Sequence, residues 1–315
     1  MMVLMLRRAP RPFGLGRALL LVLAVLLLPA VSPAAASDRD TLAARGPYLT
    51  DMAEVIVPRP GDGGSFEARL HYPVPGSSAD AGDEPTPIVA FGHGYQTAVE
   101  LYAETLDHLA SWGIVVIAPR SGGELFPSHQ AFAEDLRIAL DWVVAEAAAG
   151  GDWPAGAIDP AARGVAGHSM GGGAAVLAAA DDADIRAVAT LAAAETDPSA
   201  IEAASRLAVP SLFIAAGDDA ITPVDEHQRP MFEATRSGRA QLRTIVGGSH
   251  CGFLDSETLL LRLVCGEAAI ERDEQLASTR AALTAWLLHE LTADESLAGL
   301  AWPDGPDAWT TVETR

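Results

Sequence analysis

Residues 163–173 read Arg-Gly-Val-Ala-Gly-His-Ser-Met-Gly-Gly-Gly, an apolar run that ends in glycines and leads into the alanine-rich segment 174–180. This pattern predicts a strand, a tight turn and a helix, with Ser169 at the apex of the turn. That is the context of the G-x-S-x-G nucleophile elbow. Gly167 and Gly171 allow such a strained turn, because they carry no side chain. An ordinary glycine-rich turn is the alternative, since the short motif also arises by chance.

The start of the chain has the pattern of a secretory signal peptide. Arginines between Arg7 and Arg17 precede an apolar run over 18–28, and small residues lead to Ala36. The pattern predicts cleavage after Ala36, a secreted or periplasmic protein, and a single catalytic domain over 37–315. A membrane anchor is the alternative, but the apolar run is shorter than the ~20 residues that a spanning helix needs.

The composition limits the partners. The chain has 315 residues and a formal net charge of −21. Such an acidic surface repels nucleic acid and anionic membranes, so we expect neither as a partner after signal cleavage, and we expect a monomer. The sequence contains no metal-ligand spacing, phosphate loop or dinucleotide fingerprint, and we therefore expect no cofactor and no metal.

The chain contains two cysteines, Cys251 and Cys265. In an exported protein an isolated pair predicts a disulfide bond, because that compartment is oxidising. Closing the loop between them is worth ~3 kcal/mol in the chain-entropy model. The alternative is a pair of buried free thiols.

The hydrophobic pattern predicts an α/β fold in one domain. Residues 51–58 and 66–72 alternate as an antiparallel hairpin, and strands then alternate with helices along the chain. This order indicates a mostly parallel sheet with helices on both faces. We expect the tail after Ala293 to lie over the surface. The expected strands are 86–91, 113–119, the elbow strand, 185–194, 209–216 and 240–246; the expected helices are 99–112, 130–149, 174–180, 199–205, 225–236, 256–264 and 271–291.

A serine hydroxyl needs an imidazole to take its proton and a carboxylate to orient that imidazole. On a sheet of this kind the partners follow the serine in the order acid, then histidine, each after a strand. Asp218 and Asp219 follow the strand 209–216, and His250 follows the strand 240–246. Spacing alone does not separate the two aspartates. A surface loop histidine is the alternative for His250.

Negative charge on a substrate oxygen requires two backbone N–H donors. The residue after the serine, Met170, supplies one, and the loop 92–96 after the first parallel strand offers Tyr95 as the other. The Tyr95 ring would also cover the site and contact substrate, unless it is a core aromatic. We expect structural roles for His93 and His168.

These motifs together resemble the bacterial cutinase and polyethylene terephthalate hydrolase group, among the dienelactone hydrolase-like and chlorophyllase-like α/β-hydrolases. The resemblance rests on residues 167–173, 219–224, 247–250 and 94–95. It implies an α/β-hydrolase fold, Asp219 as the acid, and Tyr95 and Met170 as the oxyanion donors. Polyester-degrading relatives carry a tryptophan after the strand that follows the elbow helix, where this chain reads Ala192-Ala193-Ala194-Glu195.

The sequence therefore predicts an exported serine hydrolase of carboxylic esters, acting through Ser169, His250, Asp219 and an acyl-enzyme. The connection 195–208 is too short for a large lid, and an open groove fits polymeric or lipid-like esters better than small metabolites. Two other functions stay open. One is a different hydrolase activity on this scaffold, of the dienelactone hydrolase or peptidase type, and the other is a non-catalytic binding protein.

Overall fold

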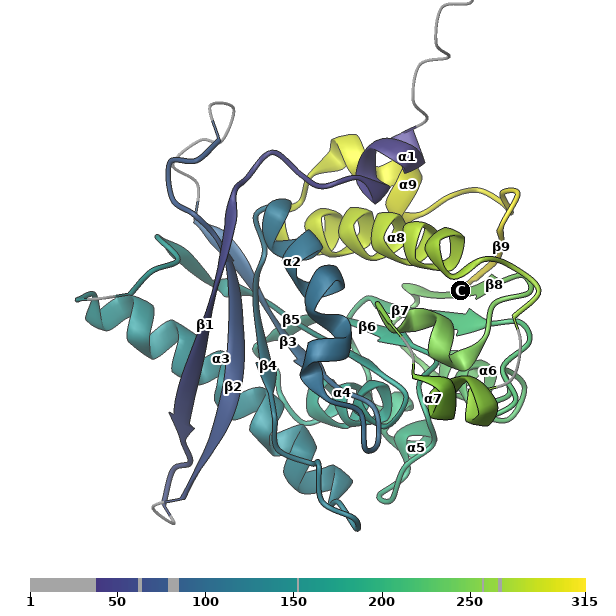
Figure 1. Cartoon of the computed structure of the whole chain (residues 1–315), viewed down its shortest axis with the longest axis horizontal. Helices are drawn as coiled ribbons and strands as arrows, with labels where there is room; N and C mark the ends of the chain where they lie inside the picture. The colour runs from purple at the N-terminus through teal and green to yellow at the C-terminus, as the bar shows by residue number, and fades with distance from the viewer. Residues whose placement is uncertain (1–37, 62–63, 79–84, 152, 257, 266–267) are drawn as a thin grey trace, which may run out of the picture. The chain divides into compact units, whose positions relative to one another are not determined.

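The computed structural model describes residues 38–315 except 62–63, 79–84, 152, 257 and 266–267 (Figure 1). The predicted signal peptide, 1–36, lies outside the described residues. None of the described helices is both long enough and apolar enough to cross a membrane. The described elements are α1 (Asp38–Ala43), β1 (Thr50–Pro58), β2 (Ser65–Pro73), β3 (Thr86–Gly92), η1 (Val99–Tyr102), α2 (Ala103–Ser111), β4 (Val115–Pro119), α3 (His129–Ala149), β5 (Ile158–His168), α4 (Met170–Ala180), β6 (Ile185–Leu191), α5 (Ala200–Ala204), β7 (Ser211–Ala216), α6 (Gln228–Ala234), β8 (Ala240–Ile245), η2 (His250–Phe253), α7 (Leu259–Cys265), α8 (Arg272–Thr292), η3 (Glu295–Leu297), α9 (Ala298–Ala301) and β9 (Thr310–Thr314).

The described strands form one sheet in the order β1-β2-β4-β3-β5-β6-β7-β8-β9. β1 and β2 form the predicted antiparallel hairpin, in which Thr50 lies opposite Pro73 and Pro58 opposite Ser65. From β4 to β8 every neighbouring pair of strands is parallel. The predicted mostly parallel sheet with an antiparallel start is confirmed.

The tail after Ala293 differs from the prediction. It contains η3 and α9, and its last strand, β9, pairs antiparallel with β8, with Thr310 opposite Ile245. The tail therefore forms an edge of the sheet and does not merely cover the surface. Four of the five residues of β9 are β-branched Thr or Val, which favour an extended strand, and the strand hydrogen-bonds to a β8 edge that would otherwise be exposed. A strand of five residues is too short to stand out in the sequence.

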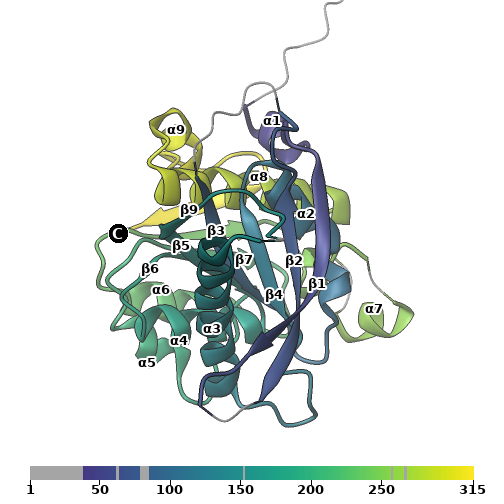
Figure 2. The same cartoon turned by 90° about the vertical axis from the view of Figure 1, so that its left-hand side faces the viewer.

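The side chains of β3 alternate between two hydrophobic cores on opposite faces of the sheet. Ile88 and Ala90 belong to one core, and Val89 and Phe91 to the other. The first core takes its helical side chains from α3 to α6, and the second takes them mainly from α2 and α8. Figures 1 and 2 show α3 and α8 on opposite sides of the sheet, as the predicted three-layer arrangement requires.

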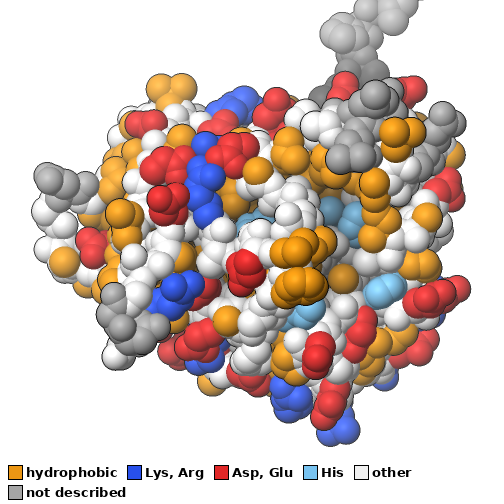
Figure 3. All heavy atoms as spheres, turned by 60° about the horizontal axis from the view of Figure 1, so that its bottom comes forward, with side chains coloured by type: hydrophobic (Ala, Val, Ile, Leu, Met, Phe, Trp, Pro, Cys, Tyr) orange, Lys and Arg blue, Asp and Glu red, His pale blue; other side chains and the backbone are white. Residues whose placement is uncertain are grey.

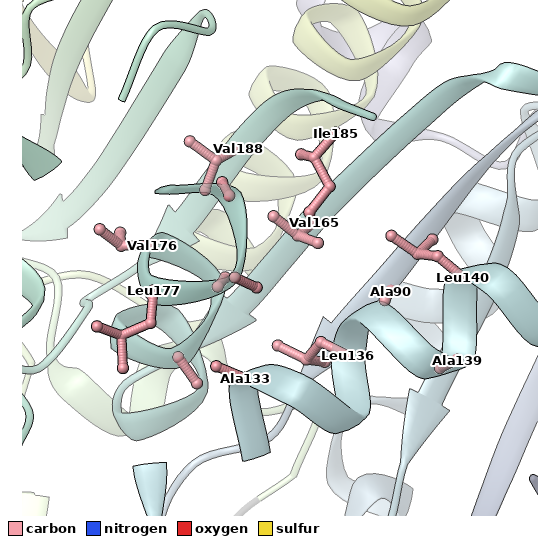
Figure 4. Close-up of a cluster of buried hydrophobic side chains, with 14 of the residues drawn as sticks. Ala90, Ala133, Leu136, Ala139, Leu140, Val165, Val176, Leu177, Ile185 and Val188 are labelled. Carbon is pink, nitrogen blue, oxygen red and sulfur yellow. The ribbon is translucent and has the colours of Figure 1, made fainter. Parts of the chain in front are cut away.

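Small residues let the first core pack closely. Leu136 of α3, Leu177 of α4 and Val165 of β5 belong to one cluster of buried side chains, part of which Figure 4 shows, and Ala133 of α3 belongs to it too. The residues named are all buried. Alanine-rich helix surfaces allow two helices to lie close to each other and to the sheet, because short side chains leave no gap to fill. This packing fixes the position of α4, and with it the turn that precedes it.

Parallel strands bring their carboxyl ends to one edge of the sheet, where ligands bind in open α/β sheets. Tyr95 follows β3, Ser169 follows β5, Asp219 follows β7 and His250 follows β8. Between β6 and β7 lies only the short helix α5, so this connection forms no large lid.

Candidate active site

Ser169 occupies a strained turn between β5 and α4. Its backbone has φ 55° and ψ −121°, a region that residues with side chains rarely adopt. Its N–H donates to the carbonyl of Leu191 at 2.9 Å, which fixes the turn against β6. A Cβ on Gly167 would lie 2.3 Å from the carbonyl oxygen of Gly171, so only glycine fits at position 167. The predicted elbow geometry is present.

Asp219 and His250 lie together although 31 residues separate them in the sequence. Nδ1 of His250 and Oδ2 of Asp219 are 2.7 Å apart, and both side chains are buried. Asp218, by contrast, is exposed, and its backbone N–H donates to Gly248. Of the two candidate aspartates, Asp219 is the one that contacts the imidazole.

Donors from its own loop surround the Asp219 carboxylate. The N–H groups of Ile221 and Thr222 each donate to Oδ1 at 2.8 Å, and the Thr222 hydroxyl donates to Oδ2 at 2.9 Å. Burial alone would raise the pKa of Asp219, but the hydrogen bond and charge of His250 and the Thr222 donors hold that pKa below its ordinary value. The carboxylate is thus kept ionised beside the imidazole.

The backbone on either side of His250 is fixed by α8. Gln275 accepts from the Ser249 N–H at 3.0 Å and donates to the Ser249 carbonyl at 2.9 Å. Arg272 donates to the carbonyl of Cys251 at 2.8 Å. The predicted disulfide between Cys251 and Cys265 is present, with Cα atoms 5.8 Å apart, and it excludes the alternative of two free thiols.

The elbow and the histidine loop meet through His168. Nε2 of His168 lies 3.1 Å from the carbonyl oxygen of His250, and the two ring centroids are 4.7 Å apart. Burial, together with the charge of His250, holds the pKa of His168 well below its ordinary value. The His250 contacts in the described part of the chain are to Asp219, Thr222 and His168, and none is to the Ser169 hydroxyl.

The loop after β3 lies against the start of α4. A Cβ on Gly171 would lie 2.2 Å from the carbonyl carbon of Gly92, so these two backbones touch. Within the residues that the structure describes, the backbone N–H groups of Tyr95 and Met170 donate to no protein acceptor. Met170 is buried, and both ring nitrogens of the buried His93 lie within 2.9 Å of carbonyl oxygens.

The Tyr95 side chain is 48% exposed, which rules out the core alternative for its ring. Its hydroxyl donates to the carbonyl of Leu125 at 2.9 Å. In the loop after β6, Ala194 donates its N–H to the carbonyl of Ser169, and Glu195 is the next residue. Oε2 of Glu195 accepts from the N–H of Ile201 at 2.9 Å, so this carboxylate caps the start of α5.

Sequence reasoning missed Thr222, Tyr102 and Gln275. The turn that contains Thr222 could have been found, because an Asp after a strand often accepts hydrogen bonds from the backbone of the residues that follow it. Tyr102 and Gln275 have no such local signal, since their contacts are with residues distant in the sequence. In the described ranges no group of three or more His, Cys, Asp or Glu side chains could hold a metal ion.

A PETase family model, described as PET hydrolase-like, matches residues 31–265. The chain belongs to the PET hydrolase-like family. Its relatives include the cutinase cut1 of Thermobifida fusca, which is 29% identical over 240 residues, 72% of this chain and 70% of the relative. A bis(hydroxyethyl) terephthalate hydrolase of Streptomyces coelicolor is 28% identical over 204 residues, 64% of this chain and 60% of the relative.

Membership of the PET hydrolase-like family, together with these relatives, identifies the chain as a carboxylic-ester hydrolase. The resemblance inferred from the sequence motifs is confirmed. The match to a lipase of Moraxella is shorter. It is 28% identical over 153 residues, 49% of this chain and 44% of the relative. The match to this family is consistent with the α/β fold described above.

Proposed function

We propose that this PET hydrolase-like chain is an exported serine esterase in which Ser169 attacks the ester carbonyl. His250 takes the serine proton and later gives a proton to the leaving alcohol, and Asp219 orients the imidazole. Water then releases the acyl group from Ser169. The observation that carries the proposal is the 2.7 Å contact between His250 and Asp219, together with the elbow that holds Ser169 at the same edge of the sheet.

The backbone N–H groups of Met170 and Tyr95 bind the oxyanion in this mechanism. Their support is that neither donates to an acceptor in the described residues, and that Gly92 and Gly171 bring the two backbones into contact. Removing one such donor typically lowers the rate about 10²–10³-fold. The half-exposed Tyr95 ring contacts the bound ester.

The substrate in this proposal is a bulky ester, polymeric or lipid-like. The short helix α5 supports a bulky substrate, because a site that no large lid covers can bind one part of a molecule that is larger than the site. The acidic chain binds neither nucleic acid nor an anionic membrane and acts as a monomer. The first 36 residues are a signal peptide, and the catalytic domain spans 37–315.

Turnover of p-nitrophenyl butyrate by the wild type and by Ser169→Ala, Asp219→Asn and Asp218→Asn variants tests the proposal. We expect Ser169→Ala to lose activity and fluorophosphonate labelling, and Asp219→Asn to lose about 10⁴-fold in kcat. Asp218→Asn is the matched control, since its side chain is exposed, and should keep wild-type turnover. Full activity of Ser169→Ala would remove the serine from the mechanism.

A further inference from the structure

β8 carries two polar side chains on a buried face of the sheet. Leu242 belongs to the first hydrophobic core and Ile245 to the second. Alternation along the strand therefore places Gln241 and Arg243 on the same face as Ile245, the face that carries α8 and α9. Strands that are covered on both faces are usually apolar on both. Arg243 is nevertheless only 6% exposed, and a buried charge needs polar partners.

The Arg243 guanidinium uses only part of its capacity to donate hydrogen bonds. Nε donates to the side chain of Gln241, and Nη2 donates to the carbonyls of Leu300 and Ala301 at 2.7 Å each. All three acceptors are neutral. A guanidinium has five N–H groups, and the two on Nη1 have no acceptor among the residues that the structure describes. Burial lowers the pKa of Arg243 to about 10, so the group is still charged at neutral pH.

Arg243 lines a cavity of about 70 Å³, which is enclosed by α1, α8, α9 and the start of β9. Figure 1 shows α1 and α9 beside α8. Arg39 of α1, Ser278 of α8 and Thr310 of β9 also line the cavity. Nη2 of Arg39 donates to Glu274 and Ser278, but its Nε is buried and has no acceptor in the described part of the chain. The cavity is larger than the ~30 Å³ that one water molecule takes up in the liquid.

The single acid in the described lining is Asp307. Its Oδ1 accepts from the N–H groups of Trp309 and Thr310 at 2.7 Å each. We propose that this cavity binds a small oxyanion that also carries a hydroxyl group, either hydrogen phosphate or a short hydroxycarboxylate such as glycolate. The oxygens of the anion accept from Arg243 and Arg39 in charge-assisted hydrogen bonds, and the hydroxyl of the anion donates to Asp307.

The remainder of the molecule offers little to attract an anion. The chain has a formal net charge of −21, and acidic side chains are spread over the face that Figure 3 shows. Such a surface repels small anions. An anion therefore needs a site that is shielded from this surface and contains a guanidinium without a carboxylate partner, and Arg243 meets both conditions within the described residues.

The cavity is separate from the candidate active site, since none of its lining residues belongs to the proposed triad or oxyanion donors. The bound anion would instead connect four segments, one of them near each end of the described chain. A ligand that binds only the folded protein stabilises it by mass action. We therefore expect the anion to raise Tm, whether or not the protein hydrolyses esters.

Isothermal titration calorimetry of the wild type with sodium phosphate, glycolate and acetate at constant ionic strength tests the choice of ligand. We expect saturable binding of phosphate, glycolate or both, and a Tm higher by about 3 °C at a tenfold excess over Kd. Acetate should bind about tenfold more weakly than glycolate, because it has no hydroxyl to donate to Asp307. Equal binding of acetate and glycolate would contradict the role of Asp307. If neither phosphate nor glycolate binds, the proposal is wrong.

Two variants test the position of the site. Arg243→Met removes the charge, and Ala281→Leu fills the cavity, which Ala281 lines. We expect each to weaken binding of the better ligand at least about tenfold. Arg206→Met is the matched control, because the Arg206 side chain is 49% exposed and pairs with Asp181, and it should keep wild-type affinity. Wild-type affinity in a folded Arg243→Met variant would overturn the proposal.

Hydrogen exchange of the wild type locates the ligand even if a variant fails to fold. With the better ligand bound, we expect slower amide exchange in the segments 38–43 and 298–312, which contribute to the cavity. The hairpin of β1 and β2 serves as the internal reference and should exchange at an unchanged rate. Protection confined to other segments would show that the anion binds elsewhere.

Discussion

Nε2 of His168 lies 3.1 Å from the carbonyl oxygen of His250, so the residue before the elbow serine binds the backbone that carries the imidazole. A carbonyl only accepts, so Nε2 carries the hydrogen, and Nδ1 of the neutral ring accepts from the Tyr102 hydroxyl at 2.8 Å. The Tyr102 oxygen accepts from the N–H of Gly94 at 3.0 Å. One chain of hydrogen bonds therefore joins the loop after β3, the elbow and the histidine loop.

Replacing Tyr102 by Phe should break this chain while keeping the buried ring. The Gly94 N–H and Nδ1 of His168 would lose their partner, so we expect the free energy of unfolding to fall by about 1–3 kcal/mol. We also expect a lower kcat, because the three loops are less firmly positioned. Urea unfolding and ester turnover measure both effects. The control is Tyr48→Phe at a partly buried ring, which should change stability by less than about 0.5 kcal/mol.

Replacing Thr222 by Val should lower kcat about tenfold with little change in KM, because a hydrogen bond to a charged group is lost while the shape is kept. The lost contact is the one from the Thr222 hydroxyl to Oδ2 of Asp219. Steady-state kinetics of Thr222→Val and Thr222→Ser test this. The serine variant keeps the hydroxyl and should restore most of the rate. Wild-type kcat in the valine variant would show that the hydroxyl does not orient the acid.

The lowered pKa of Asp219 predicts a pH dependence of stability. As the pH falls, the unfolded state takes up a proton at the ordinary Asp pKa of about 4, before the folded state does. The contribution of Asp219 to folding is therefore complete above that pH and is lost as the pH falls towards the folded-state pKa. Urea unfolding at pH 7, 5 and 3 should show a smaller loss of stability in Asp219→Asn than in the wild type. Equal losses in the two proteins would contradict the prediction.

Replacing Gly171 by Ala should damage both stability and turnover. The added Cβ would lie 2.2 Å from the backbone of Gly92, and overpacking of this kind costs about 1–3 kcal/mol. We expect a lower Tm and a strong loss of kcat, because the loop after β3 must move away from the elbow. Gly299→Ala is the matched control, since nothing lies within 4 Å of a Cβ there. Its Tm and turnover should stay at wild-type values.

The order of strands and helices was predictable because each element has its own local pattern. The hairpin of β1 and β2, the elbow between β5 and α4, and the buried strands β7 and β8 all follow from periodicity and glycine positions. β9 was not predictable, since its pairing with β8 depends on a partner more than sixty residues earlier in the sequence. Short strands gain stability from their neighbours, and single-sequence patterns do not contain that information.

The sequence alone determined the residue types of the candidate site and their order, because a strained turn requires glycines around Ser169 and loop residues follow each strand. Spacing alone did not distinguish Asp218 from Asp219, which are adjacent and chemically identical, and only the family resemblance favoured Asp219. The tertiary structure decided between them, because only Asp219 lies within hydrogen-bond distance of His250. It also supplied Tyr102 and Gln275, whose contacts with residues distant in the sequence exist only after folding. Hydrogen bonds are short-ranged, so their partners are set by position in space and not by distance along the chain.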